Sequence, residues 1–206
     1  MTIDYIALVR SGRDALDPKA PATVGTASGP AACVFLHGDG VAWAGSTCRL
    51  PSGTAQYVCQ SSWRRRQGDR SPPSPYRVAT LATLFQGLAQ ARRADSFASA
   101  GSLCSLARDG RLLIEIRGGP RDQRDAIETL ELVLAAAALE FPARVLFGVG
   151  ALGHLAGDGL RRWRQLTDHD LMPVLLERPA EAGIGTAIGR AQADGLRADA
   201  LHVVRL

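Results

Sequence analysis

A single cysteine followed closely by three arginines is the arrangement in this chain best suited to covalent chemistry. Cys59 ends a short apolar stretch, and Arg64, Arg65 and Arg66 come five to seven residues later. The nucleophilic form of cysteine is the thiolate, and nearby cations or the free amides of a helix N-terminus raise its fraction. We therefore expect Cys59 to carry an exposed, reactive thiol.

The residues between Cys59 and the arginines predict how this thiol is held. Ser61 or Ser62 is suited to cap a short helix that starts at Trp63, which leaves Cys59 just ahead of the positive end of the helix. The alternative is that Cys59 is a small apolar residue that closes a core strand, a common role for a lone cysteine. Both interpretations place Cys59 at the end of a strand.

Two further polar residues follow an earlier apolar strand, Cys33–Leu36. His37 and Asp39 lie in the glycine-rich turn after this strand. Because the carboxyl ends of parallel strands meet at one edge of an α/β sheet, we expect both residues to approach Cys59 there. The other histidines are scattered without ligand spacing, so the sequence indicates no metal and no cofactor.

Composition limits the class of protein. The chain has 206 residues, 46% of them hydrophobic and 21% charged, which is typical of a globular protein with one or two domains. No stretch is long and apolar enough for a signal peptide or a membrane span, so we expect a cytoplasmic protein without a membrane partner. Four cysteines without a Cys-x-x-Cys pair leave single-thiol chemistry open. The arginine groups lack an aromatic platform, so nucleic acid is not favoured as a partner.

Hydrophobic periodicity predicts an α/β chain in which one order of elements occurs twice. Besides the strand ending at Cys59, the first half is expected to contain strands at Ile3–Val9, Cys33–Leu36 and Asp95–Ala100 and a helix at Val78–Ala91. The second half is expected to contain strands at Leu112–Arg117, Arg144–Phe147, Met172–Leu176 and from Ala198 onward, and helices at Asp122–Leu139, Leu160–Leu166 and Ile184–Asp194. The boundary is expected at Leu106–Gly110.

These patterns resemble a known family. Val58-Cys59-x-x-Ser62-x-x-Arg65-Arg66 looks like the cysteine loop of the DsrE/TusD sulfur-relay proteins, and the turn after Leu36 looks like their "DGV" turn. The second half resembles the DsrF/TusC branch, with Val174-Leu175-Leu176 where the family would place a cysteine. The resemblance implies two tandem three-layer α/β/α domains with mainly parallel sheets. Residues 1–107 would form the DsrE/TusD-like domain with the cysteine, and residues 108–206 the DsrF/TusC-like domain without it.

The family also implies a function. Cys59 would accept and release sulfane sulfur as a persulfide, Arg64, Arg65 and Arg66 would stabilise the anionic sulfur, and Trp63 would help to dock a partner. Implied partners are small sulfur carriers of the DsrC/TusE-like or TusA-like kind, other DsrE-family subunits, and further copies of the chain in a homo-oligomer. The short link at Gly45–Ala55 departs from the family, which has a helix there. A non-catalytic assembly subunit of a sulfurtransferase complex is therefore the alternative.

A third interpretation comes from the glycines of the second half. Gly148-x-Gly150-x-x-Gly153 follows a predicted strand, and Glu177 closes the next one. This spacing is typical of dinucleotide sites, in which glycines let a pyrophosphate approach a helix and the acid binds a ribose hydroxyl. Too few residues follow Glu177 for the remaining strands of such a domain. A packing role for these glycines is therefore favoured over nucleotide binding.

Overall fold

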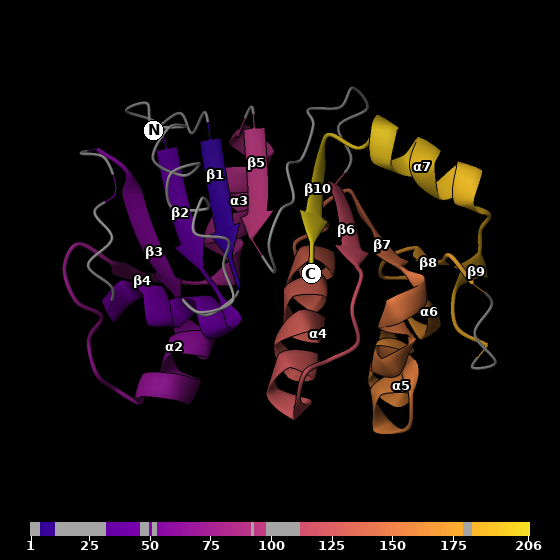
Figure 1. The fold of residues 1–206 in the computed structure, drawn as a ribbon, viewed down its shortest axis with the longest axis horizontal. Coiled ribbons are helices and arrows are strands. Elements are labelled where there is room, and N and C mark those ends of the chain that lie inside the picture. The colour runs from indigo at the N-terminus through magenta and orange to yellow at the C-terminus, as the bar shows by residue number, and fades with distance from the viewer. Residues whose placement is uncertain are drawn as a thin grey trace. The chain divides into compact units, whose positions relative to one another are not determined.

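The computed structural model describes residues 5–10, 32–45, 50, 53–91, 93–97, 112–178 and 183–206. The chain divides into two compact units, residues 1–104 and 105–206, each built around its own sheet (Figure 1). We call these the first unit and the second unit. The predicted boundary at Leu106–Gly110 lies outside the described residues, as do Cys48 and Cys104.

The first unit contains a five-stranded sheet with the order β4-β3-β2-β1-β5. Every strand pair in it is parallel. Its elements are β1 (Tyr5–Val9), β2 (Ala32–Leu36), the 3-10 helix η2 (Gly38–Gly45), β3 (Ala55–Cys59), α2 (Gln60–Gln67), β4 (Arg77–Ala79), α3 (Leu81–Gln90) and β5 (Arg93–Phe97).

The second unit contains a five-stranded parallel sheet with the order β10-β6-β7-β8-β9. Its elements are β6 (Leu112–Ile116), α4 (Gln123–Ala138), β7 (Ala143–Phe147), the 3-10 helix η3 (Val149–Leu155), α5 (Asp158–Trp163), α6 (Gln165–Asp168), β8 (Val174–Leu176), β9 (Thr186–Ala187), α7 (Arg190–Asp199) and β10 (His202–Arg205). The predicted α/β class with mainly parallel sheets is thus confirmed.

The described parts of both units follow the same strand order. If β1 is matched with β6 and the others follow in sequence, the two orders are identical. Helices α3 and α7 each end at an extended alanine, Ala91 and Ala200, before the last strand. The strand expected from Ala198 onward begins only at His202, because α7 continues to Asp199. The expected repeat of one order of elements is therefore seen in the strand order of the two sheets.

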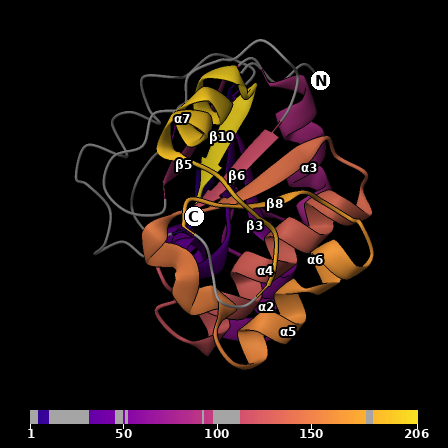
Figure 2. The same ribbon diagram turned by 90° about the vertical axis from the view of Figure 1, so that its right-hand side faces the viewer.

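Both sheets are covered on two faces, which explains their nearly continuous apolar strands. In the first unit, η2 and α2 pack on one face through Val41, Trp43 and Trp63, and α3 buries Leu84, Phe85 and Leu88. In the second unit, α4, α5 and α6 lie on one side of the sheet and α7 on the other (Figure 2). Right-handed crossovers that run in opposite directions along a sheet place their helices on opposite faces. Within the described residues, no helix has the length and apolarity to cross a membrane.

Two predicted helices begin too early. The predicted helix Val78–Ala91 starts only at Leu81, because Val78 lies in β4 and Thr80 has an extended backbone. The predicted helix Ile184–Asp194 starts only at Arg190, after the short strand β9. In both cases apolar residues ahead of the helix, Val78 and Ile184, happen to continue the helical spacing.

Candidate functional site

Cys59 lies where a strand passes directly into a helix. It is the last residue of β3 and the N-cap of α2, which begins at Gln60. The predicted helix start at Trp63 is therefore wrong, and neither Ser61 nor Ser62 is the capping residue. Because the first amides of a helix lack partners within the helix, this position brings Cys59 to the positive end of α2.

The thiol of Cys59 is buried, in contrast to the predicted exposure. Its residue is 1% exposed, and its Sγ lies 3.3 Å from Ser61 Oγ. Strands β2 and β4 flank β3 on either side, and Cys59 itself pairs with Ala79. Ser62 accepts a hydrogen bond of 3.0 Å from the amide of Gly38, which joins α2 to η2 over this strand end.

His37 lies at the same edge of the sheet. The register pairs Leu36 of β2 with Val58 of β3. His37 and Cys59 are the next residues along these two neighbouring strands. The side chain is fully buried, and its Nδ1 accepts a hydrogen bond of 3.3 Å from Arg10 Nε. Burial lowers the pKa of His37 well below its usual value, and the charges of Arg10, Arg66 and Arg65 lower it further.

The proton of neutral His37 is therefore on Nε2. Among the described residues no hydrogen-bond partner of this Nε2 is seen. An unpaired buried donor is uncommon, because such groups usually find a partner. The expected approach of His37 to Cys59 thus has support from the backbone register.

The three arginines after Cys59 differ in their surroundings. Arg66 turns toward η2 and donates to Asp39 Oδ1 from Nε and Nη2 at 3.2 and 2.9 Å, and to Ser62 O at 3.3 Å. Arg64 and Arg65 are exposed. Asp39 is thus bound to the arginine group, and this ion pair fixes the last turn of α2 against η2.

Trp63 is buried rather than displayed as a docking surface. It is 7% exposed, packs in the core of the first unit and donates from Nε1 to Arg70 O at 2.5 Å. One edge of the ring lines a hollow of about 160 Å³ together with Gln60, Arg64 and the loop of residues 68–72. Little of the Trp63 ring is therefore available at the surface.

The second unit has a larger pocket, of about 590 Å³, which lies at the carboxyl ends of β6, β7 and β8 beside α7. Its lining residues are Glu115, Arg117, Gly148, Val149, Glu177, Arg190, Asp194 and Arg197. In parallel sheets, ligands bind at this edge where the direction of the crossovers reverses. Here the reversal falls between β6 and β10.

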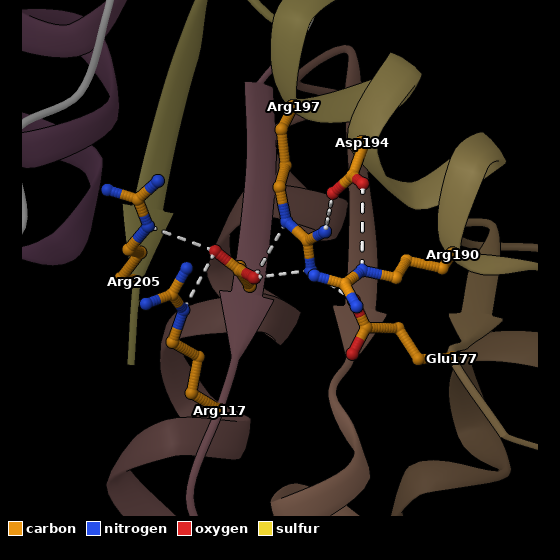
Figure 3. A network of polar contacts seen from close by, with 7 residues as sticks. Arg117, Glu177, Arg190, Asp194, Arg197 and Arg205 are labelled. Carbon is orange, nitrogen blue, oxygen red and sulfur yellow. Dashed lines mark hydrogen bonds and ion pairs between the residues drawn. The ribbon is translucent and has the colours of Figure 1, made fainter.

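A network of ion pairs joins charged residues that line this pocket (Figure 3). Glu115 in β6 is 1% exposed and accepts hydrogen bonds from Arg197 at 2.9 and 2.7 Å and from Arg205 at 3.0 Å. Arg117 Nε lies 3.2 Å from the same carboxylate, and Arg197 also binds Glu177 and Asp194. Burial alone would raise the pKa of Glu115, but these arginines outweigh it and lower the pKa.

The glycines of the second unit pack against the chain instead of leaving room for a pyrophosphate. A Cβ at Gly150 would lie 2.6 Å from the carbonyl oxygen of Arg117, and one at Gly153 would lie 3.3 Å from Pro120 Cδ. They belong to the 3-10 helix η3, not to the start of an α-helix. Glu177 is bound to Arg197. These contacts favour the packing role that the sequence indicated.

Sequence reasoning missed the network because its members are far apart in the chain. The available signal was a glutamate inside the apolar strand Leu112–Ile116, where a carboxylate needs charged partners. Within the described parts of the chain, no group of three or more histidine, cysteine or acidic residues is placed to hold a metal ion. Comparisons with protein-family models, curated proteins and solved structures found no match.

Proposed function

We propose that this protein carries sulfane sulfur as a persulfide on Cys59 and passes it between the thiols of carrier proteins. The observation that supports the proposal is the position of Cys59 between the end of a parallel strand and the first turn of α2. Cationic Arg10 and Arg66 and neutral His37 gather at the same edge of the sheet. Positive charges at this edge favour the anion of a persulfide and offset the cost of burying it.

The reaction consists of two displacements without net redox change. The Cys59 thiolate attacks the outer sulfur of a donor persulfide, so that an S–S bond forms on Cys59 and the donor leaves as a thiolate. The acceptor thiolate then attacks the outer sulfur of Cys59, whose own sulfur leaves as thiolate. Each step keeps the number of S–S bonds constant.

The surrounding residues have separate roles in this proposal. The Nε2–H of His37 offers a hydrogen bond to the loaded sulfur. Arg66, which is held in place by its hydrogen bonds to Asp39 and Ser62, stabilises the negative charge of this sulfur. Exposed Arg64 and Arg65 steer acidic carriers toward the hollow beside Trp63. Because Cys59 is buried, sulfur exchange requires α2 or the adjoining loop to move aside. Burial then protects the persulfide from small reductants between transfers.

Suitable partners are small sulfur-carrier proteins of the DsrC/TusE-like or TusA-like kind, and other DsrE-like subunits including copies of this chain. The burial of Cys59 favours one alternative, a non-catalytic subunit that supports true sulfurtransferases. In that case the cysteine is a core residue. The two functions differ in whether Cys59 exchanges sulfur at all.

A load-and-chase experiment tests the proposal. The protein is incubated with a persulfide donor, desalted, and then mixed with an excess of an acceptor thiol while its intact mass is followed. We expect a gain of one sulfur atom that disappears on addition of the acceptor, and no gain in Cys59→Ser. Wild-type protein that never gains sulfur would favour the assembly role, provided that both proteins give the same thermal unfolding midpoint.

A further inference from the structure

The pocket of the second unit contains charged atoms that its internal ion pairs leave available. Arg197 uses its Nε, Nη1 and Nη2 on Glu115, Asp194 and Glu177. Arg117, by contrast, is bound to Glu115 through Nε, and its side chain is 54% exposed. This single contact fixes the plane of the guanidinium and leaves both Nη groups for a ligand. Two parallel N–H donors of this kind match a carboxylate.

A second cation and two acids complete the lining. Arg190 at the start of α7 is 94% exposed and meets Asp194 only at 4.0 Å through Nε. Glu177 binds Arg197 through Oε1, and no hydrogen bond to its Oε2 is seen among the described residues. Asp194 binds Arg197 through Oδ1, which leaves Oδ2 for a weak contact with Arg190 or for a ligand. The pocket thus presents free donors and free acceptors together (Figure 3).

The charge balance decides which class of ligand fits. The pocket is lined by three arginines and three carboxylates, so its formal charge is close to zero. A polyphosphate or a nucleotide would leave several negative charges unpaired, and repulsion by Glu177 and Asp194 would oppose it. A zwitterion pairs with both kinds of group. Val149, which is 52% exposed at the rim, adds a small apolar contact.

We propose that this pocket binds a small zwitterion of the α-amino acid type. Its carboxylate lies on the free Nη groups of Arg117, and its ammonium group lies on Glu177 and Asp194. Buried Glu115 does not touch the ligand but holds Arg117 and Arg197 in place. The volume of about 590 Å³ accommodates an amino acid with a sizeable side chain.

The first experiment uses the intact protein and a matched set of probes. Thermal unfolding is recorded with a panel of free α-amino acids, each compared with the amine that lacks its carboxylate and the acid that lacks its ammonium group. Inorganic phosphate and AMP complete the panel. We expect at least one amino acid to raise the unfolding midpoint in a concentration-dependent way, and its amine and acid to have much weaker effects.

Calorimetric titration with the amino acid that stabilises the protein most then tests whether Arg117 contributes to binding. Arg117→Met keeps the aliphatic stem and should weaken binding by roughly ten- to hundredfold, since a hydrogen-bonded charge pair is lost. The matched control is Arg161→Met, because Arg161 is 80% exposed on α5 and forms a comparable ion pair outside the pocket. It should bind as the wild type does.

Several results would overturn the proposal. They are the absence of any amino-acid effect, equal binding of phosphate or AMP, equal binding of the bare amine or acid, and unchanged affinity in Arg117→Met. None of these results depends on Cys59, so the pocket and the sulfur chemistry fail or succeed separately.

Discussion

Glu177 stands in the second unit where Cys59 stands in the first. Leu36 pairs with Val58 in one sheet and Phe147 pairs with Leu176 in the other, and the next residues are Cys59 and Glu177. The sequence placed the counterpart of the cysteine at Val174–Leu176, which is too early in the chain. Each unit thus has an ionisable side chain at the same strand end, a thiol in one and a carboxylate in the other.

Arg66 should support the reactivity of Cys59 more than Arg64 does. Arg66→Met removes the ion pair with Asp39, and we expect slower alkylation of Cys59 by several-fold and a loss of about 0.5–1 kcal/mol in unfolding free energy. Arg64→Met, a matched change on the exposed side of α2, should alter neither value. Alkylation rates from peptide mass spectrometry test this. Equal rates in the two variants would mean that Arg66 has only a structural role.

His37 should make the stability of the first unit depend on pH. Its pKa is lowered in the folded protein, so the unfolded chain binds a proton first as the pH falls. Stability is then constant above the usual value of 6.5 and declines below it, by up to about 1.4 kcal/mol per pH unit. His37→Gln keeps an acceptor for Arg10 and should remove this dependence. Urea unfolding of both proteins between pH 5 and about 7.5 measures the difference; parallel curves would contradict the buried neutral histidine.

Glu115 should give the stability of the second unit a pH dependence of the same sign as that of His37, at lower pH. Its folded-state pKa lies below 4.5, so its contribution is complete above that pH and is lost as the pH falls through the lowered value. Glu115→Gln leaves Arg197 and Arg205 without this buried anion and should destabilise the second unit by about 3 kcal/mol at neutral pH. Hydrogen exchange of the β6 amides reports on this unit alone. Wild-type protection in the variant would show that the network contributes little.

The glycines of η3 should be required for packing. Gly150→Ala places a Cβ 2.6 Å from Arg117 O and should destabilise the second unit by about 1–3 kcal/mol. The control is Gly118→Ala in the same loop system, because nothing lies within 4 Å of its Cβ. Chemical denaturation of the two variants decides the matter. If Gly150→Ala unfolds like the wild type, the close contact with Arg117 is not a real constraint.

The α/β class and most strands were predictable because strands buried on both faces appear in the sequence as continuous apolar runs. Cys33–Leu36 and Leu112–Ile116 could be read directly, and Asp122 accepts the hydrogen bond from Asp125 N that marks the start of α4. Helix starts at Leu81 and Arg190 were missed because short edge strands precede them. A three- or two-residue strand has no periodicity of its own.

The candidate sites were only partly predictable. Cys59, His37 and Asp39 could be found because each follows or ends an apolar strand, but the burial of Cys59 depends on the strands on either side of it. The pocket of the second unit joins Glu115 to Arg197, 82 residues apart, and no local pattern indicates such a pair. Long-range ion pairs of this kind can be predicted only when the topology is already known.

Site-resolved persulfide mapping of Cys59 against Cys33 tests the central proposal most directly. Burial raises the pKa of Cys33 to about 12, so this thiol stays protonated and should remain unloaded at neutral pH. The proposal predicts that the added sulfur maps to the Cys59 peptide and that Cys33→Ser leaves this loading unchanged. Loading of Cys33 equal to that of Cys59, or none at Cys59 in folded protein, would contradict it.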